Sequence, residues 1–198
     1  MKNIIIFGGS FDPITKGHEY IIDAIKHKYP EDEIWLFPCM SHYFDKVMTS
    51  SADRIKMCQI IAKKHNIKAY LDTLKTFHAG VAYRNYSEDN FKYIIGMDNA
   101  NNISSWYKGD VLPSIATFIV IPRGGYKTNK KSWYTSPPHS ILDVCPLKIS
   151  STQVREAIKN KKSLDKLVDK EIINYISTHN LYVNAHHLYG EYNGQANY

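Results

Sequence analysis

The segment from Phe7 to His18 carries the residues best suited to chemistry. It reads Phe-Gly-Gly-Ser-Phe-Asp-Pro-Ile-Thr-Lys-Gly-His and lies between the apolar run Ile4–Ile6 and an amphipathic stretch. Gly8 and Gly9 let the backbone approach a ligand without a Cβ in the way. A helix that begins near Gly17 offers free N–H groups and the positive end of its dipole to phosphate. The segment therefore predicts a nucleotide-binding turn between a strand and a helix.

The spacing of this segment differs from two common phosphate-binding loops, the G-x-G-x-x-G of dinucleotide-binding proteins and the G-x-x-x-x-G-K-[ST] of P-loops. A glycine turn by itself is most often an ordinary connection with a surface histidine. Here Phe11-Asp12-Pro13 is followed four residues on by Gly17-His18, which favours a functional site. We expect Asp12 to be structural, with its side chain bonded to local backbone groups that fix the turn.

A second polar segment, Ile149–Arg155, reads Ile-Ser-Ser-Thr-Gln-Val-Arg. Its hydroxyl side chains are typical of a helix cap, whose N–H groups can bind phosphate. Arg155 lies one turn from Ser151 on the same helix face, so a phosphate at the cap would meet the guanidinium. The alternative is an ordinary N-cap with an arginine that faces solvent.

Short β-rich runs alternate with helical patterns along the chain. The strand candidates are Asn3–Phe7, Glu33–Phe37, Lys68–Leu71, Lys92–Ile95, Thr117–Ile121 and Ile141–Val144, and the helix candidates are Gly17–His27, Ala52–His65, Ser151–Lys161 and Asp169–His179. Within Ala52–His65 the apolar face runs through Ile55, Cys58, Ile61 and Ala62. This alternation predicts an α/β fold, a Rossmann-like doubly wound parallel sheet with helices on both faces and a small C-terminal helical extension. Ligands of such sheets sit beyond the carboxyl ends of the strands, where the Gly8-Gly9 turn lies.

Length and composition indicate one domain. Of the 198 residues we assign 1–184 to a single domain and 185–198, rich in His, Tyr, Asn and Gly, to a disordered tail. His186-His187 in that tail is read as incidental, and Arg123–His139 as a basic surface loop. Three widely separated cysteines predict neither a disulfide framework nor a zinc site, and with no secretory signal expected they favour a reducing, cytoplasmic setting.

The net charge of +6 and the pI near 9.0 suit an anionic partner, either nucleic acid or a phosphorylated substrate. The chain has no RNP-type, zinc-finger or helix-turn-helix signature, so we expect no nucleic-acid partner. It also has no apolar run near the roughly 20 residues that span a bilayer, so we expect no membrane partner.

Both polar segments resemble signatures of one enzyme superfamily. Thr15-Lys16-Gly17-His18 is similar to the [H/T]-x-G-H of adenylyl- and cytidylyltransferases, and Ile149–Arg155 resembles their I-S-S-T-x-[VI]-R. Within that superfamily the chain resembles the nicotinate (nicotinamide) mononucleotide adenylyltransferases over roughly residues 1 to 183. The matching blocks are Tyr93–Asp98 followed by Trp106-Tyr107, Ile119–Tyr126, and Ile172–Tyr182.

The alternative within the superfamily is phosphopantetheine adenylyltransferase of coenzyme A biosynthesis. These enzymes carry a G-x-F-D-P-I-T-x-G-H segment, and Ile14-Thr15 of this chain is closer to it than to the histidine version common in nicotinate mononucleotide adenylyltransferases. The arginine-rich R-G-[LI]-R segment that they also carry is missing from this chain. A non-catalytic nucleotide sensor is disfavoured because both phosphate motifs are intact.

The resemblance implies transfer of the adenylyl group of ATP to nicotinate mononucleotide, giving deamido-NAD and pyrophosphate, with Mg²⁺ bound through the ATP phosphates and no metal ligand from the protein. It implies catalytic roles for His18, Thr15, Lys46 and Arg155. Nucleotide binding is implied for Gly8, Gly9, Ser10, Phe11, Gly17, His18, Gly96, Asp98, Ile149, Ser150, Ser151, Thr152 and Arg155, and mononucleotide binding for Lys46, Ser105, Trp106 and Arg123.

Individual roles follow from the same resemblance. His18 and Thr15 would act on the ATP phosphates, Lys46 would bridge the substrate and α-phosphates, and the Ser151–Arg155 helix start would hold the β- and γ-phosphates. Asp98 would contact a hydroxyl or ribose, the alternative being a helix N-cap. Trp106 would stack on the pyridine ring, the alternative being a core residue.

Two departures from the family pattern concern the substrate side. Pro38–Lys46 replaces the usual P-H-K run, and we take Lys46 as its lysine. The S-Y-T segment that touches the pyridine ring has no clear match around Phe77–Tyr83. The choice between the acid and the amide mononucleotide, and whether the chain forms a homo-oligomer, stay open.

Overall fold

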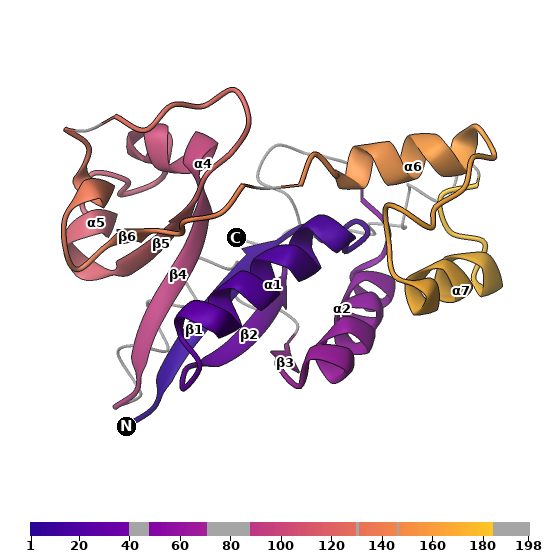
Figure 1. Cartoon of the computed structure of the whole chain (residues 1–198), viewed down its shortest axis with the longest axis horizontal. Helices are drawn as coiled ribbons and strands as arrows, with labels where there is room; N and C mark the ends of the chain where they lie inside the picture. Colours follow the sequence, from indigo (N-terminus) through magenta and orange to yellow (C-terminus); the bar gives the residue numbers. More distant parts are fainter. Residues whose placement is uncertain (40–47, 71–87, 130, 146, 184–198) are drawn as a thin grey trace, which may run out of the picture.

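The computed structural model describes residues 1–39, 48–70, 88–129, 131–145 and 147–183 (Figure 1). Within these ranges six strands form one sheet, in the order β3-β2-β1-β4-β5-β6, and every neighbouring pair is parallel. The strands are β1 Asn3–Gly9, β2 Glu33–Pro38, β3 Lys68–Ala69, β4 Asn90–Gly96, β5 Thr117–Ile121 and β6 Ser140–Ile141. This is the strand order of Rossmann folds, so the predicted doubly wound parallel sheet is confirmed.

The direction of strand addition reverses beside β1. From β1 the chain adds β2 and β3 on one side, and it then returns to place β4 on the other side of β1. Ligands of open parallel sheets bind in the crevice that such a reversal leaves at the carboxyl ends of the strands. The Phe7–His18 segment starts inside β1 and leaves it at this end.

The helices comprise four longer and several short ones. They are α1 Lys16–Lys28, α2 Ser51–His65, α4 Met97–Asn101, α5 Leu112–Ile115, α6 Ser151–Lys159 and α7 Lys170–Thr178, with 3-10 turns η1 Ile103–Ser105 and η2 Trp133–Thr135. The four longer helices lie where the apolar periodicity predicts them, within two residues at each end. The short ones were not predicted, because a single turn is too brief to show a helical period.

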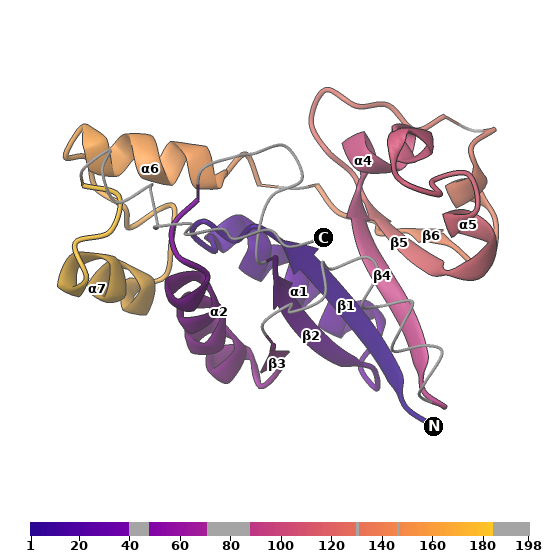
Figure 2. The ribbon, with the colours of Figure 1, turned by 180° about the vertical axis from the view of Figure 1, so that it is seen from behind.

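Side chains of β1 pack into two hydrophobic cores, one on each face of the sheet. Ile5 and Phe7 join a buried cluster with α1, α2, α6 and α7, whereas Ile4 and Ile6 join a second cluster with α4 and α5. Successive strand residues point to opposite faces, so a strand covered on both sides reads as a continuous apolar run. Figure 2 shows β4, β5, β6, α4 and α5 at one end of the molecule and α6 and α7 at the other.

The α6–α7 extension is tied to the start of α1. The backbone N–H of Lys16 donates to the carbonyl of Leu167 at 2.9 Å, and Val154 and Ile172 are fully buried in the same cluster as α1. The predicted tail, 185–198, lies outside the described residues. In the part of the chain that is described, no helix is long and apolar enough to cross a membrane.

Candidate active site

His18 is held by the residue that caps its own helix. Thr15 is the N-cap of α1, and its backbone N–H and its hydroxyl lie 3.0 and 2.8 Å from Nδ1 of His18. A backbone N–H can only donate, so Nδ1 is an acceptor and the neutral ring carries its proton on Nε2. The arrangement fixes both the tautomer and the orientation of the imidazole.

The surroundings of His18 keep this ring neutral. The imidazole is partly buried and meets the ring of Phe11 edge-on, with centroids 5.1 Å apart, and that of Phe7 at 6.0 Å. Burial, and secondly the positive charge of Arg123, lower the pKa of His18 from 6.5 to about 4. At neutral pH the side chain is therefore a hydrogen-bond donor without charge.

Two glycines make close approaches possible around this histidine. A Cβ on Gly9 would lie 3.2 Å from the ring of Phe11, and one on Gly17 would lie 3.1 Å from the carbonyl oxygen of Ile149. Gly9 thus makes room for Phe11, which is buried and has a φ of 45°, in the left-handed region that costs energy for a side chain of this size. Gly17 lets the start of α1 approach the second motif.

The second motif docks on the turn that follows β1. Ser150 caps α6 through its hydroxyl, which accepts from the Gln153 N–H. Ser151 donates to the carbonyl of Pro13 at 2.8 Å, and Nη1 of Arg155 donates to the carbonyl of Asp12 at 2.6 Å. The two motifs therefore meet in space, and the alternative of a solvent-facing Arg155 is wrong. Thr152 completes the contact, since its hydroxyl lies 3.2 Å from Nη2 of Arg155.

The predicted local backbone partners of the Asp12 side chain are wrong, because its hydrogen-bond partner lies far away in the sequence. The carboxylate is buried, and Oδ1 accepts from the hydroxyl of Tyr182 at 2.8 Å, across 170 positions of sequence. Burial and the neighbouring carboxylate raise the pKa of Tyr182. The segment after α7 is in this way bonded directly to the turn after β1.

Arg54 belongs to the site and was missed in the sequence. Its side chain is only 1% exposed, and it donates to three carbonyls, those of Ser10 at 2.9 Å, Cys39 at 2.6 Å and Thr49 at 2.8 Å. Ile55, which the apolar pattern placed on the buried face of α2, is only partly buried. A charged residue on an apolar helix face was the available signal.

An acidic and a basic residue face each other at the ends of β4 and β5. Asp98 Oδ2 forms an ion pair with Nη1 of Arg123, and Asp98 Oδ1 is buried with no hydrogen-bond partner among the described residues. Gly96, not Asp98, is the N-cap of α4, so the N-cap alternative for Asp98 is wrong. A Cβ on Gly96 would lie 2.6 Å from Asp98 Oδ1, so any larger residue here would displace this carboxylate from its position.

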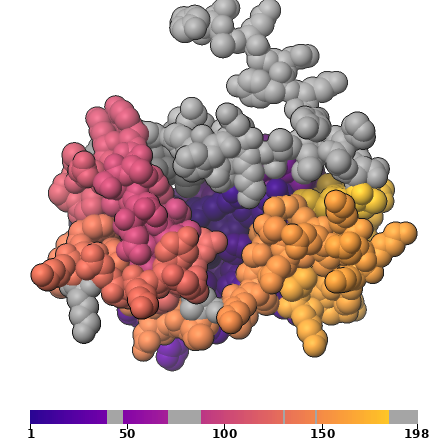
Figure 3. Space-filling view, turned by 90° about the horizontal axis from the view of Figure 1, so that it is seen from above, coloured from indigo at the N-terminus to yellow at the C-terminus, as the bar shows by residue number. Residues whose placement is uncertain are grey.

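Ser105 ends the 3-10 turn η1, and Trp106 follows it, in the segment after α4. Trp106 is partly exposed and packs against the second core cluster, and the Ser105 hydroxyl donates to the carbonyl of Asn102 at 2.8 Å. Lys46 and Phe77–Tyr83 lie outside the described residues. Figure 3 shows the N-terminal residues, in indigo, set back between the residues around β4–β6 on one side and those of α6–α7 on the other.

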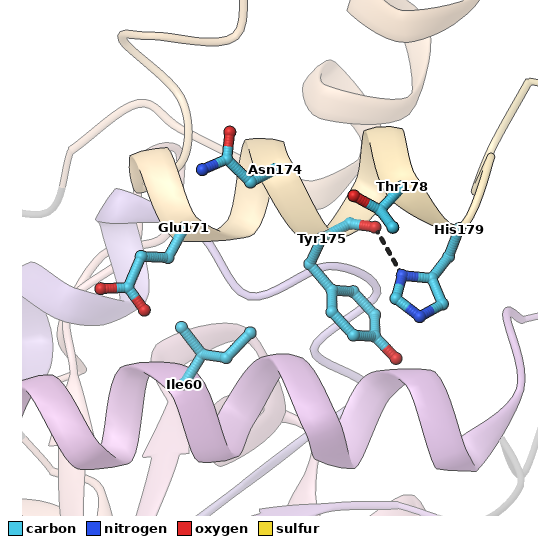
Figure 4. Close-up of a pocket in the computed structure, with 6 residues that line it drawn as sticks. All are labelled: Ile60, Glu171, Asn174, Tyr175, Thr178 and His179. Carbon is cyan, nitrogen blue, oxygen red and sulfur yellow. Dashed lines mark hydrogen bonds between the residues drawn. The ribbon is translucent and has the colours of Figure 1, made fainter.

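A separate hollow between α2 and α7 has no residue from either motif (Figure 4). It is lined by Ile60, Glu171, Asn174, Tyr175, Thr178 and His179. Two of these residues, Tyr175 and His179, contact each other in the wall of the hollow, since their rings stack with centroids 4.0 Å apart. Across the described ranges, no group of three or more His, Cys, Asp or Glu residues could hold a metal ion.

Known proteins are similar to this chain in sequence and in fold. Residues 6–157 match the cytidylyltransferase-like family. The nicotinate-nucleotide adenylyltransferase of Bacillus subtilis (strain 168) is 31% identical over 193 residues, which cover 92% of this chain and 99% of that protein. The Plasmodium falciparum nicotinic acid mononucleotide adenylyltransferase, solved in complexes with NaAD and with APC, superposes with TM-scores of 0.77 and 0.76 at 28% identity, over 92% of this chain and 98% of its own.

Proposed function

Since the chain belongs to the cytidylyltransferase-like family and is related along 92% of its length to nicotinate-nucleotide adenylyltransferases, we propose that it transfers the adenylyl group of ATP to nicotinate mononucleotide in NAD biosynthesis. The observation that carries the proposal is the meeting of the two motifs. Ser151 and Arg155 bond the carbonyls of Pro13 and Asp12, which places the start of α6 beside the start of α1 and His18. Two helix N-termini at one crevice suit a polyphosphate.

The reaction needs no covalent nucleophile from the protein. A phosphate oxygen of the mononucleotide attacks the α-phosphorus of ATP, a new P–O bond forms, and the bond to the β-phosphate oxygen breaks in line to release pyrophosphate. Catalysis then consists of positioning two polyanions and stabilising charge on the transferred group. The described residues offer donors for this task and no Ser-His-Asp or Cys-His arrangement is required.

His18 is proposed to donate from Nε2 to the ATP phosphates, because Nδ1 is already bonded to Thr15. The start of α6, with Ser151, Thr152 and the remaining N–H groups of Arg155, is proposed to hold the β- and γ-phosphates. Gly8, Gly9, Ser10, Phe11 and Gly17 would supply the backbone around the nucleotide, together with Gly96, Ile149 and Ser150. Lys46 keeps its proposed role as a bridge between the substrate and α-phosphates.

The mononucleotide is proposed to bind beside β4 and β5. Trp106 would stack on the pyridine ring, and Ser105, Asp98 and Arg123 would contact its polar groups. Asp98 pairs with Arg123, and its Oδ1 has no hydrogen-bond partner among the residues that the structure describes. This free acceptor at the strand ends supports the placement.

Mg²⁺ is proposed to reach the site bound to the ATP phosphates. A hard, strongly hydrated cation of this kind takes few protein ligands when the nucleotide supplies oxygens, and the donor set here fits that, since the described residues hold no cluster of carboxylates. Bound there, the ion would neutralise charge on the phosphates.

We also propose that residues 1–184 act as one nucleotidyltransferase domain in the cytoplasm.

Parallel assays distinguish this function from its alternative. Pyrophosphate release is measured with ATP and, in separate reactions, nicotinate mononucleotide, nicotinamide mononucleotide and phosphopantetheine. Turnover with nicotinate mononucleotide is expected. Turnover with phosphopantetheine alone would replace the proposal by the coenzyme A enzyme, and oligonucleotide binding without ATP turnover would revive a nucleic-acid module.

A further inference from the structure

We infer that Arg54 is a positioning residue for ATP, which acts by fixing the backbone of the Ser10–Phe11 turn and does not itself touch the substrate. The inference rests on the proposed function, because it concerns how that site binds its nucleotide. It starts from the burial of a guanidinium under the turn, on a helix whose other buried residues are apolar.

Arg54 joins three segments that meet below the turn. Nη1 donates to the carbonyl of Ser10, at the end of β1, and to that of Cys39, at the end of β2, while Nε donates to that of Thr49, next to α2. A buried guanidinium is costly unless its N–H groups are hydrogen-bonded, so the positions of these carbonyls and of the arginine depend on one another.

The bond to Ser10 determines the direction of the next N–H group. The Ser10–Phe11 peptide is trans, because the cis bonds of the described chain are at Asp12-Pro13 and Pro137-Pro138. In a trans peptide the carbonyl and the N–H point in opposite directions. With the Ser10 carbonyl held toward Arg54, the N–H of Phe11 points away from α2.

Phe11 needs such support because its own backbone is strained. Its φ of 45° is unfavourable for a phenylalanine, and a conformation of this kind persists only where the surroundings enforce it. Arg54 enforces it from the Ser10 side and Arg155 from the Asp12 side. The ring of Phe11 in turn packs on His18, so a displaced turn would also displace the imidazole. The positive charge of Arg54 also lies below the proposed binding site for ATP, where it attracts the negatively charged phosphates.

Arg54→Met tests this inference, with Arg54→Lys as the conservative variant and Met57→Ala as the control. Met57 is fully buried on the same helix, and its side chain belongs to the apolar cluster. The dissociation constant for ATP is measured by calorimetry without a mononucleotide, and amide hydrogen exchange is followed at Phe11. Arg54→Met is expected to weaken ATP by about tenfold and to speed exchange at Phe11, since it removes charged hydrogen bonds. Arg54→Lys should fall between Arg54→Met and the wild type.

The control separates positioning from general stability. Met57→Ala should lower the thermal midpoint without changing the ATP dissociation constant. Wild-type ATP affinity and wild-type exchange at Phe11 in Arg54→Met would overturn the inference, as would an equal loss of ATP affinity in Met57→Ala. If Arg54→Met does not fold, unchanged ATP affinity in Arg54→Lys has the same force. A wild-type protein that binds ATP but releases no pyrophosphate with any mononucleotide would contradict the proposed function and leave this comparison intact.

Discussion

Thr15 bonds Nδ1 of His18 twice, through its backbone N–H at 3.0 Å and its hydroxyl at 2.8 Å. One residue thus caps α1 and fixes the tautomer of the proposed catalytic imidazole. The ring is a neutral donor at physiological pH, because burial lowers its pKa to about 4. Charge in the transition state is then stabilised by a donor that needs no proton uptake first.

Removal of the His18 ring should lower turnover and leave the fold intact. For His18→Ala we expect kcat to fall by roughly 10²-fold or more, the usual effect of losing one transition-state donor. His27→Ala, an exposed histidine on the same helix, is the matched control and should keep wild-type kcat. Steady-state kinetics and circular dichroism check both variants. Wild-type kcat in a folded His18→Ala protein would remove His18 from the chemistry.

The lowered pKa of His18 makes stability depend on pH in one direction. The unfolded chain binds a proton at His18 near pH 6.5, whereas the folded protein resists it until about pH 4. The stabilising effect of the neutral ring is therefore complete above pH 6.5 and is lost as the pH falls toward 4. Urea unfolding at pH 7 and pH 5 should show a larger loss for the wild type than for His18→Asn, whereas His27→Ala should behave as the wild type. An NMR titration that places His18 near 6.5 would contradict this account.

Trp106 separates recognition of the pyridine ring from recognition of phosphate. Trp106→Ala should raise the KM for the mononucleotide, because it removes about 1–3 kcal/mol of binding free energy, the range for stacking of a base on an aromatic ring. The KM for ATP should change little. Trp133→Phe is the control, because Trp133 is also a partly buried tryptophan packed against the second cluster, with its ring centroid 5.2 Å from that of Phe118. If Trp106→Ala lowers the thermal midpoint by many degrees with KM unchanged, Trp106 is a core residue, and Tyr107 and Tyr83 are the next candidates.

Tyr182, in the segment after α7, should stabilise the turn after β1. Tyr182→Phe removes the hydroxyl that donates to the buried Asp12 carboxylate and should cost about 1–3 kcal/mol of unfolding free energy, as expected for a buried charged acceptor left without its donor. Tyr175→Phe is the control, since the Tyr175 hydroxyl also donates to a carboxylate, that of Asp53, on α2. Denaturant unfolding measures both. Equal, small losses in the two variants would show that the Asp12 contact has no special weight.

The sheet and the long helices could be predicted because each depends on a local period of apolar residues. The predicted strand Thr117–Ile121 is β5 at both ends, and β1 differs only by running on through the glycines to Gly9. The outer strands β3 and β6 differ from the predicted Lys68–Leu71 and Ile141–Val144. β3 is Lys68–Ala69 and stops before Tyr70, while Leu71 lies outside the described residues, and β6 is Ser140–Ile141. Apolar composition does not reveal where pairing with a single neighbour stops.

The contacts that hold the site could not be predicted in the same way. Tyr182 and Asp12 are separated by 170 positions, and no spacing rule links them. Arg54 was open to prediction, because it stands four and seven residues before Cys58 and Ile61, both fully buried on α2. A charge in register with such a stripe indicates a buried cation with backbone acceptors, whereas the apolar pattern alone places Ile55 on that face.

We expect the α-phosphorus of ATP to be the atom that the mononucleotide attacks. ATP labelled at the α-phosphate is incubated with the wild-type protein, Mg²⁺ and nicotinate mononucleotide, and the products are separated. The label is expected in a dinucleotide, formed in equal amount with unlabelled pyrophosphate. Label left in ADP with release of inorganic phosphate, or no label in any dinucleotide, would contradict it.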